Sequence, residues 1–183
     1  MLRLEISGGE LFDEKEGKFI IVKPQTLQLE HSLVSVSKWE SKWKKPFMRQ
    51  EPMTVEETID YIRYMTVSPQ NVNSEVYKFI NQDHVQKVMD YIHDPMTATT
   101  IKETPGHKRG STQVLTSELL YYYMTAYQIP FEVCQKWHLN RLLMLIRVCD
   151  EKQQKPKKMS KAEIANQNRK RNAARKAKYH TRG

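Results

Sequence analysis

The 183-residue chain is 39% hydrophobic and 28% charged, which is enough apolar content for a packed domain and excludes an intrinsically disordered protein. Its net charge of +9 is confined to the C-terminus: residues 151–183 hold twelve basic and two acidic residues, whereas residues 1–150 hold 18 and 19. The longest uncharged apolar stretch, Leu119–Phe131, is too short for a transmembrane helix, so no membrane partner is expected.

Residues 1–31 predict a small antiparallel meander of three strands. Leu2, Leu4 and Ile6 alternate with charged residues, which is the period of a half-buried strand. The apolar run Phe19–Val22 predicts the second strand, and Leu27 with Leu29 the third; the charged segment Glu10–Lys18 is expected to form a loop.

Residues 32–150 predict a mainly helical body. Ser32 can cap a helix over Leu33–Trp43, and Asn81 one over residues 82–93. Thr54 and Glu57 form a capping box that opens a third helix. The apolar face predicted for that helix comprises Ile59, Tyr61, Ile62 and Met65.

The stretch Thr116–Cys149 predicts two adjoining helices, the first capped by Thr116 or Ser117 and the second starting at Pro130. On a wheel of 100° per residue, the second helix is apolar around most of its circumference, which favours a buried position. Arg141 falls in the middle of the broad apolar face. Because a buried guanidinium needs an acceptor, a structural ion pair is predicted for Arg141. The candidate acceptors are the carboxylates of Glu118, Asp60 and Asp94.

Aromatic residues are the candidate partner-binding positions. Trp39 and Trp43, four residues apart, predict either an exposed aromatic ridge or two core anchors. In the run Tyr121–Tyr123 the three rings cannot share one face of a helix. Tyr122, and with it Tyr121, is expected to be partly exposed, either at an interface or flat on the domain's own surface.

No pattern in the sequence indicates catalysis. The chain has no Gly-rich phosphate loop, no CxxC, no HExxH and no nucleophile elbow, so neither an enzyme nor a cofactor is expected. Cys134 and His138 have metal-ligand spacing, but a zinc site needs three or four ligands. Two cysteines on one predicted helix are typical of buried thiols in a reducing compartment.

Residues 151–183 predict a polar linker followed by a basic helix that begins at a second capping box, Ser160–Glu163. The candidate contacts of this tail are Lys157, Lys158, Arg169, Lys170, Arg171 and Arg175. Clustered basic residues release phosphate counterions, so nucleic acid is one expected partner. A solubilising tail and docking on an acidic protein surface are the alternatives.

Several segments in order carry a resemblance to a known family: residues 37–47 (SKWESKWKKPF), 54–66 (TVEETIDYIRYMT), 94–99 (DPMTAT), 130–149 and 159–178. Together they resemble the tail assembly chaperones of long-tailed (siphovirus-like) bacteriophages. The resemblance implies a non-enzymatic assembly factor that acts in the cytoplasm of the infected cell. It would bind the tape measure protein, yield it to polymerising tail tube protein, and be absent from the finished virion.

The sequence therefore predicts an α+β fold, mostly helical, with a small N-terminal sheet on a helical body and a basic C-terminal helix. The leading functional hypothesis is a tail assembly chaperone, for which homo-oligomerisation is a further expectation. The alternatives are a nucleic-acid-binding protein that acts through its tail and a structural connector or tail protein of the virion.

Overall fold

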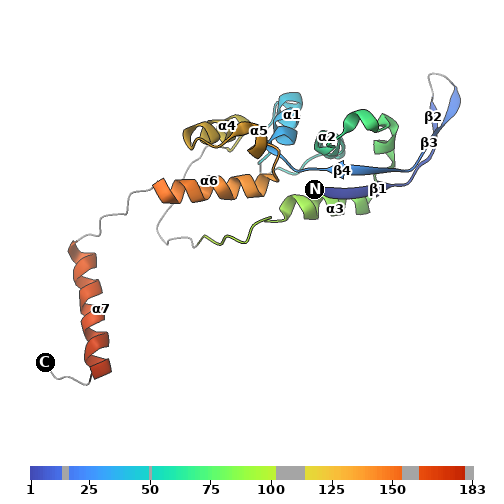
Figure 1. Cartoon of the computed structure of the whole chain (residues 1–183). Helices are drawn as coiled ribbons and strands as arrows, with labels where there is room; N and C mark the ends of the chain where they lie inside the picture. Colours follow the sequence, from blue (N-terminus) through green and yellow to red (C-terminus); the bar gives the residue numbers. More distant parts are fainter. Residues whose placement is uncertain (14–16, 50, 102–113, 154–160, 180–183) are drawn as a thin grey trace. The chain divides into compact units, whose positions relative to one another are not determined.

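The computed structural model describes residues 1–13, 17–49, 51–101, 114–153 and 161–179. The fold is α+β and mostly helical, with a small antiparallel sheet at the N-terminus, as the sequence predicts (Figure 1). The chain divides into two compact units, Met1–Cys149 and Asp150–Gly183. Among the described residues, those of the buried core all lie in the first unit.

The first and last strands of the N-terminal region pair with each other. β1 (Leu2–Ile6) runs antiparallel to β4 (Gln25–Leu29), with Leu4 opposite Leu27. Because alternate side chains of a strand point to the same face, the apolar residues form one buried face and the polar ones remain exposed. This buried face packs on the helices and confirms the alternation in the sequence.

The segment Glu10–Lys18, predicted as a loop, contains a strand. β2 (Gly9–Asp13) pairs with β3 (Lys18–Val22), and β1 pairs with β4. The four strands therefore form one long hairpin with two consecutive paired segments, and not the predicted three-stranded meander (Figure 1). The paired strands approach closely at Gly8, where a Cβ would lie 2.0 Å from the carbonyl oxygen of Val22. Glycine at this position therefore permits a continuous hairpin.

Three predicted helices form with the caps that the sequence indicates: α1 (Leu33–Trp43), α2 (Val55–Met65) and α3 (Gln82–His93). The Ser32 side chain accepts a backbone N–H group at the start of α1, and the Asn81 side chain accepts one at the start of α3. Thr54 and Glu57 form the predicted reciprocal capping box at the start of α2.

The helix α4 (Ser117–Ala126) begins without a side-chain hydrogen bond from its N-cap residue, Thr116. The buried Glu40 carboxylate of α1 accepts the Ser117 N–H at 2.8 Å and also the Phe47 N–H at 2.7 Å. Negative charge is favourable at a helix N-terminus. A residue distant in sequence therefore replaces the expected cap.

The single helix predicted over Pro130–Cys149 is wrong. Two helices form, α5 (Phe131–Cys134) and α6 (Leu139–Gln153), with non-helical residues between them. The Leu139 N–H donates to the His31 carbonyl at 2.7 Å, and a backbone bridge joins the same two segments. These long-range hydrogen bonds replace the helical ones and break the helix.

The buried ion pair predicted for Arg141 is also wrong. The break shifts the phase of the helix, so the buried face of α6 is formed by Leu139, Leu142 and Ile146. Arg141 is exposed, and its guanidinium lies 4.4 Å from the centroid of the Trp137 ring. A cation over the face of an indole ring is favourable at an exposed site, so no buried acceptor is required.

Candidate partner-binding groove

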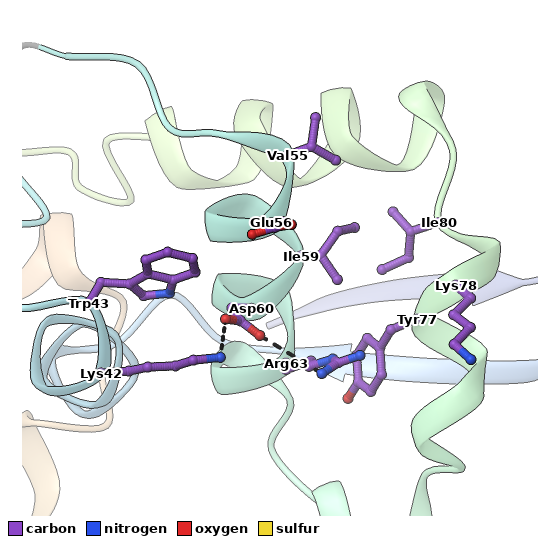
Figure 2. A pocket seen from close by; sticks show the side chains of 10 residues that line it. All are labelled: Lys42, Trp43, Val55, Glu56, Ile59, Asp60, Arg63, Tyr77, Lys78 and Ile80. Atoms are coloured by element: carbon purple, nitrogen blue, oxygen red, sulfur yellow. Dashed lines mark hydrogen bonds and ion pairs between the residues drawn. The ribbon is translucent and has the colours of Figure 1, made fainter. Parts of the chain in front are cut away.

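A groove with a volume of about 510 Å³ opens on the surface of the first unit. It lies between the end of α1, the outer face of α2 and the region of η2 (Ser74–Phe79), the second of two 3₁₀ helices after η1 (Pro69–Asn71). Figure 2 shows the apolar side chains of Val55, Ile59 and Ile80 facing the same space. The other apolar lining residues are Trp43 and Tyr77.

The groove exists because the apolar stripe of α2 is wider than its buried part. The buried part includes Tyr61, Ile62 and Met65. Val55 and Ile59 are four residues apart and Ile59 is three residues before Ile62, so Val55 and Ile59 continue this stripe toward the surface. Val55 is 80% exposed, and Ile59 is half-buried in the groove. Ile59, which the sequence predicted on the apolar face of this helix, packs against the core on one side and lines the groove on the other.

Charged side chains form the rim of the groove. Asp60 makes an ion pair with Lys42 and lies 3.8 Å from the Arg63 guanidinium. Glu56 and Lys78 complete the charged lining. Exposed ion pairs of this kind contribute only about 0–1 kcal/mol to stability. A partner can therefore exchange them for its own charges at small cost to the fold.

Trp43 forms the α1 side of the groove and is half-buried (Figure 2). The ammonium groups of Lys42 and Lys45 lie 5.5 and 5.9 Å from the centroid of its ring. Its indole Nε1–H is buried and has no acceptor among the residues that the structure describes. An unsatisfied buried donor costs about 1–3 kcal/mol, so this N–H weakens the packing of Trp43 rather than stabilising it.

The Glu57 carboxylate fixes the two helices that form the groove. It accepts hydrogen bonds from Lys45 at 2.8 Å, Arg49 at 2.5 Å and the Thr54 N–H at 2.9 Å. The hydrogen bond from Lys45, followed by that from Thr54, lowers the pKa of Glu57 from 4.5 to about 2. The α1–α2 connection is thereby tied to the start of α2. The sequence indicates the capping bond but not the two cations.

The structure separates the two tryptophans that the sequence paired as partner-binding residues. Trp39 is fully buried, and its Nε1–H donates to the Glu57 carbonyl at 2.9 Å. Trp39 is therefore a core anchor and cannot contact a partner directly. Trp43, with its ring centroid 6.3 Å from that of Trp39, is the one that lines the groove.

Tyr121 and Tyr122 lie on α4 and do not line the groove. Tyr121 is half-buried, packs edge-on against Phe131 and donates to the Gln135 side chain at 3.2 Å. Tyr122 is 65% exposed, as the sequence predicts. The structure therefore does not bring the predicted tryptophan and tyrosine sites together.

A second apolar surface lies on the β2–β3 part of the hairpin. Phe12 and Phe19 are directly opposite each other, with ring centroids 5.2 Å apart, and Ile21 lies on the same face. All three side chains are more than half exposed. This surface was not predicted, because residues 10–18 were expected to form a loop.

The other predicted site residues that the structure describes are not among the residues that line the groove. Lys157 and Lys158 fall outside the described residues, and the other basic tail residues are exposed on α7 (Lys161–Tyr179) in the second unit. Cys134 is buried at the end of α5, and His138 is buried within the helix break, directly before α6. Within the described ranges, no group of three or more His, Cys, Asp or Glu side chains could hold a metal ion.

The chain matches no protein-family model, no curated protein and no solved structure. In the part of the chain that the structure describes, no helix has the length and apolar character needed to cross a membrane.

Proposed function

We propose that this protein is a non-enzymatic tail assembly chaperone of long-tailed bacteriophages. It acts in the cytoplasm of the infected cell, binds an amphipathic helix of the tape measure protein in the groove, and releases it as tail tube protein polymerises. The family resemblance of the sequence supplies this context. The groove between α1, α2 and η2 is the observation that supports the mode of binding.

The lining of the groove fits an amphipathic helix. Helix-in-groove recognition uses apolar anchors at spacings of three and four residues, which enter a hydrophobic groove. Here Ile59, Ile80 and Trp43 provide apolar surface, while Lys42 and Arg63 lie among the charges around it. An apolar centre with a polar rim is the ordinary composition of a protein interface.

Co-expression with the tape measure protein, the large helix-rich product expected from the adjacent gene, tests this proposal. We expect the tape measure protein to be soluble only when this chain is present. The variant Val55→Asp places a charge in the groove and should reduce the soluble co-purified partner about tenfold or more. Aspartate is favourable in the first turn of a helix, so this variant should remain folded.

Val133→Asp is the matched control, because Val133 is also an exposed valine, 59% accessible, but lies on α5 and does not line the groove. It should leave the co-purified partner unchanged. Equal losses for the two variants would contradict binding in the groove. A tape measure protein that stays insoluble with the unmodified chain would contradict the chaperone function itself.

A further inference from the structure

The helix α7 has an unusual charge distribution that the chaperone function does not use. It spans 19 residues, Lys161–Tyr179, and every side chain described in it is exposed. At a rise of 1.5 Å per residue, the helix is about 28 Å long. Its basic residues are Lys161, Arg169, Lys170, Arg171, Arg175, Lys176 and Lys178, against a single acidic residue, Glu163.

The basic residues of α7 surround the helix. At 100° per residue, no sector wider than about 100° is without a lysine or arginine. An apolar protein surface or a membrane is contacted by large apolar side chains on one face of a helix. In α7 the sector without a basic residue, about 100° wide, includes Asn166, Ala173 and Ala177 and no large apolar side chain. The large apolar residues are Ile164 and Tyr179, which are 45% and 65% exposed, so the helix has no large apolar face for either surface.

A groove of a nucleic acid duplex matches this arrangement. A helix in such a groove has a phosphate backbone on each side, so cations on opposite flanks can all be paired. The major groove of B-DNA is about 12 Å wide and admits an α-helix of about 10–12 Å diameter. The major groove of A-form RNA is too narrow for side chains to read. The charge distribution thus favours duplex DNA.

Polar side chains suited to base edges lie between the cations. Asn166, Gln167, Asn168 and Asn172 are exposed on α7, and their amides can both donate and accept hydrogen bonds. Arginine pairs with phosphate through two parallel N–H groups. We infer that α7 is a DNA-binding helix that inserts into the major groove of duplex DNA. Its affinity is supplied mainly by phosphate contacts.

Fluorescence anisotropy of the full-length protein with a labelled 20-base-pair DNA duplex tests this inference. We expect a dissociation constant in the micromolar range at about 50 mM salt. If α7 makes five phosphate contacts, raising the salt concentration from about 50 mM to about 200 mM should weaken binding about 10²–10³-fold. Duplex RNA and single-stranded DNA of the same length should bind at least about tenfold more weakly, because neither offers a wide major groove.

A fourfold variant of α7 should bind DNA with an affinity more than about 30-fold lower than that of the unmodified protein. It replaces Arg169, Lys170, Arg171 and Arg175 with glutamine. The matched control replaces four exposed lysines of the first unit, Lys23, Lys38, Lys87 and Lys136, with glutamine. It removes the same charge and should bind DNA within about twofold of the unmodified protein.

Three results would overturn the inference: equal losses in the two fourfold variants, equal affinity for duplex and single-stranded DNA, or no DNA binding by the unmodified protein at low salt. In the last case, retention of the protein on an acidic polypeptide would assign α7 to protein contacts. The α7 variant should still solubilise the tape measure protein, so this test and that of the chaperone function can fail independently.

Discussion

Replacing Trp39 with alanine is expected to lower the free energy of unfolding by about 3–5 kcal/mol, the range for removing a buried aromatic side chain. Trp39 is fully buried. Its ring packs edge-on against Phe47, with centroids 5.4 Å apart, and the Arg49 guanidinium lies 5.6 Å from its centroid. The substitution therefore removes a large apolar contact and a hydrogen bond to the Glu57 carbonyl at once. Urea unfolding followed by circular dichroism measures the loss.

Trp43→Ala on the same helix is the matched control for this prediction. Trp43 is half-buried, and its indole N–H makes no hydrogen bond within the described residues. Its replacement should cost less than half as much stability, yet it should weaken binding in the groove. Equal destabilisation by the two substitutions would show that the assignment of Trp39 to the core and Trp43 to the groove is wrong.

Acidification below about pH 6.5 is expected to destabilise the first unit, because it holds a buried neutral histidine. His31 is buried, and its Nδ1 lies 2.5 Å from the Tyr61 hydroxyl. Burial is the main cause that lowers the pKa of His31 from 6.5 to about 3, and the positive charges of His138 and His93 lower it further. Burial likewise lowers the pKa of His138, whose ring centroid is 5.1 Å from that of His31.

The sign follows from proton binding. Between pH 6.5 and 3, the unfolded chain binds a proton at His31 and the folded chain does not, so stability falls as the pH falls. At about 1.4 kcal/mol per pH unit, His31 alone should remove about 2 kcal/mol between pH 7 and pH 5. Glu57, with its pKa of about 2, adds a loss only as the pH falls from 4.5 to 2.

Urea unfolding at pH 7, 6 and 5 tests this pH dependence. His31→Gln should lower stability at pH 7 and make the pH dependence shallower over this range. His84→Gln is the control, because His84 lies at the start of α3 and is only half-buried. If the unmodified protein were equally stable at pH 7 and pH 5, the buried neutral state of His31 would be contradicted.

The helices that the sequence predicts correctly are those whose ends are set by nearby residues. Ser32, Thr54 and Asn81 all cap helices at the expected positions, since a cap acts within three or four residues. The break between α5 and α6 was missed because its cause lies far away in the chain. The hydrogen bond from the Leu139 N–H to the His31 carbonyl has no signature in the sequence around Leu139.

The error at Arg141 followed from the missed break. A helical wheel is meaningful only while the helix is continuous, and four non-helical residues between Cys134 and Leu139 change its phase.

The β2 strand was missed for a different reason. Glycines and charges around residues 8–18 indicate a loop, whereas here Gly8 permits the close approach of two paired strands.

The groove could be predicted only in part. Trp43 was named as a partner-binding residue, and the structure places it in the groove. Val55 and Ile59 were not predicted to line a groove, because Ile59 belongs to the same apolar face as the buried residues of α2 and Val55 only extends that face. An apolar residue at the exposed first position of a capped helix, as at Val55, is the signal that could have revealed this face.

A photo-cross-link from the groove to the tape measure protein tests the proposed binding in the groove most directly. A photoreactive amino acid at Val55 replaces an 80% exposed side chain, and the same substitution at Val133 replaces a 59% exposed one outside the groove. In the co-expressed complex, we predict cross-links from position 55 to one helical segment of the tape measure protein and none from position 133. A soluble complex that cross-links from position 133 but not from position 55 would contradict binding in the groove.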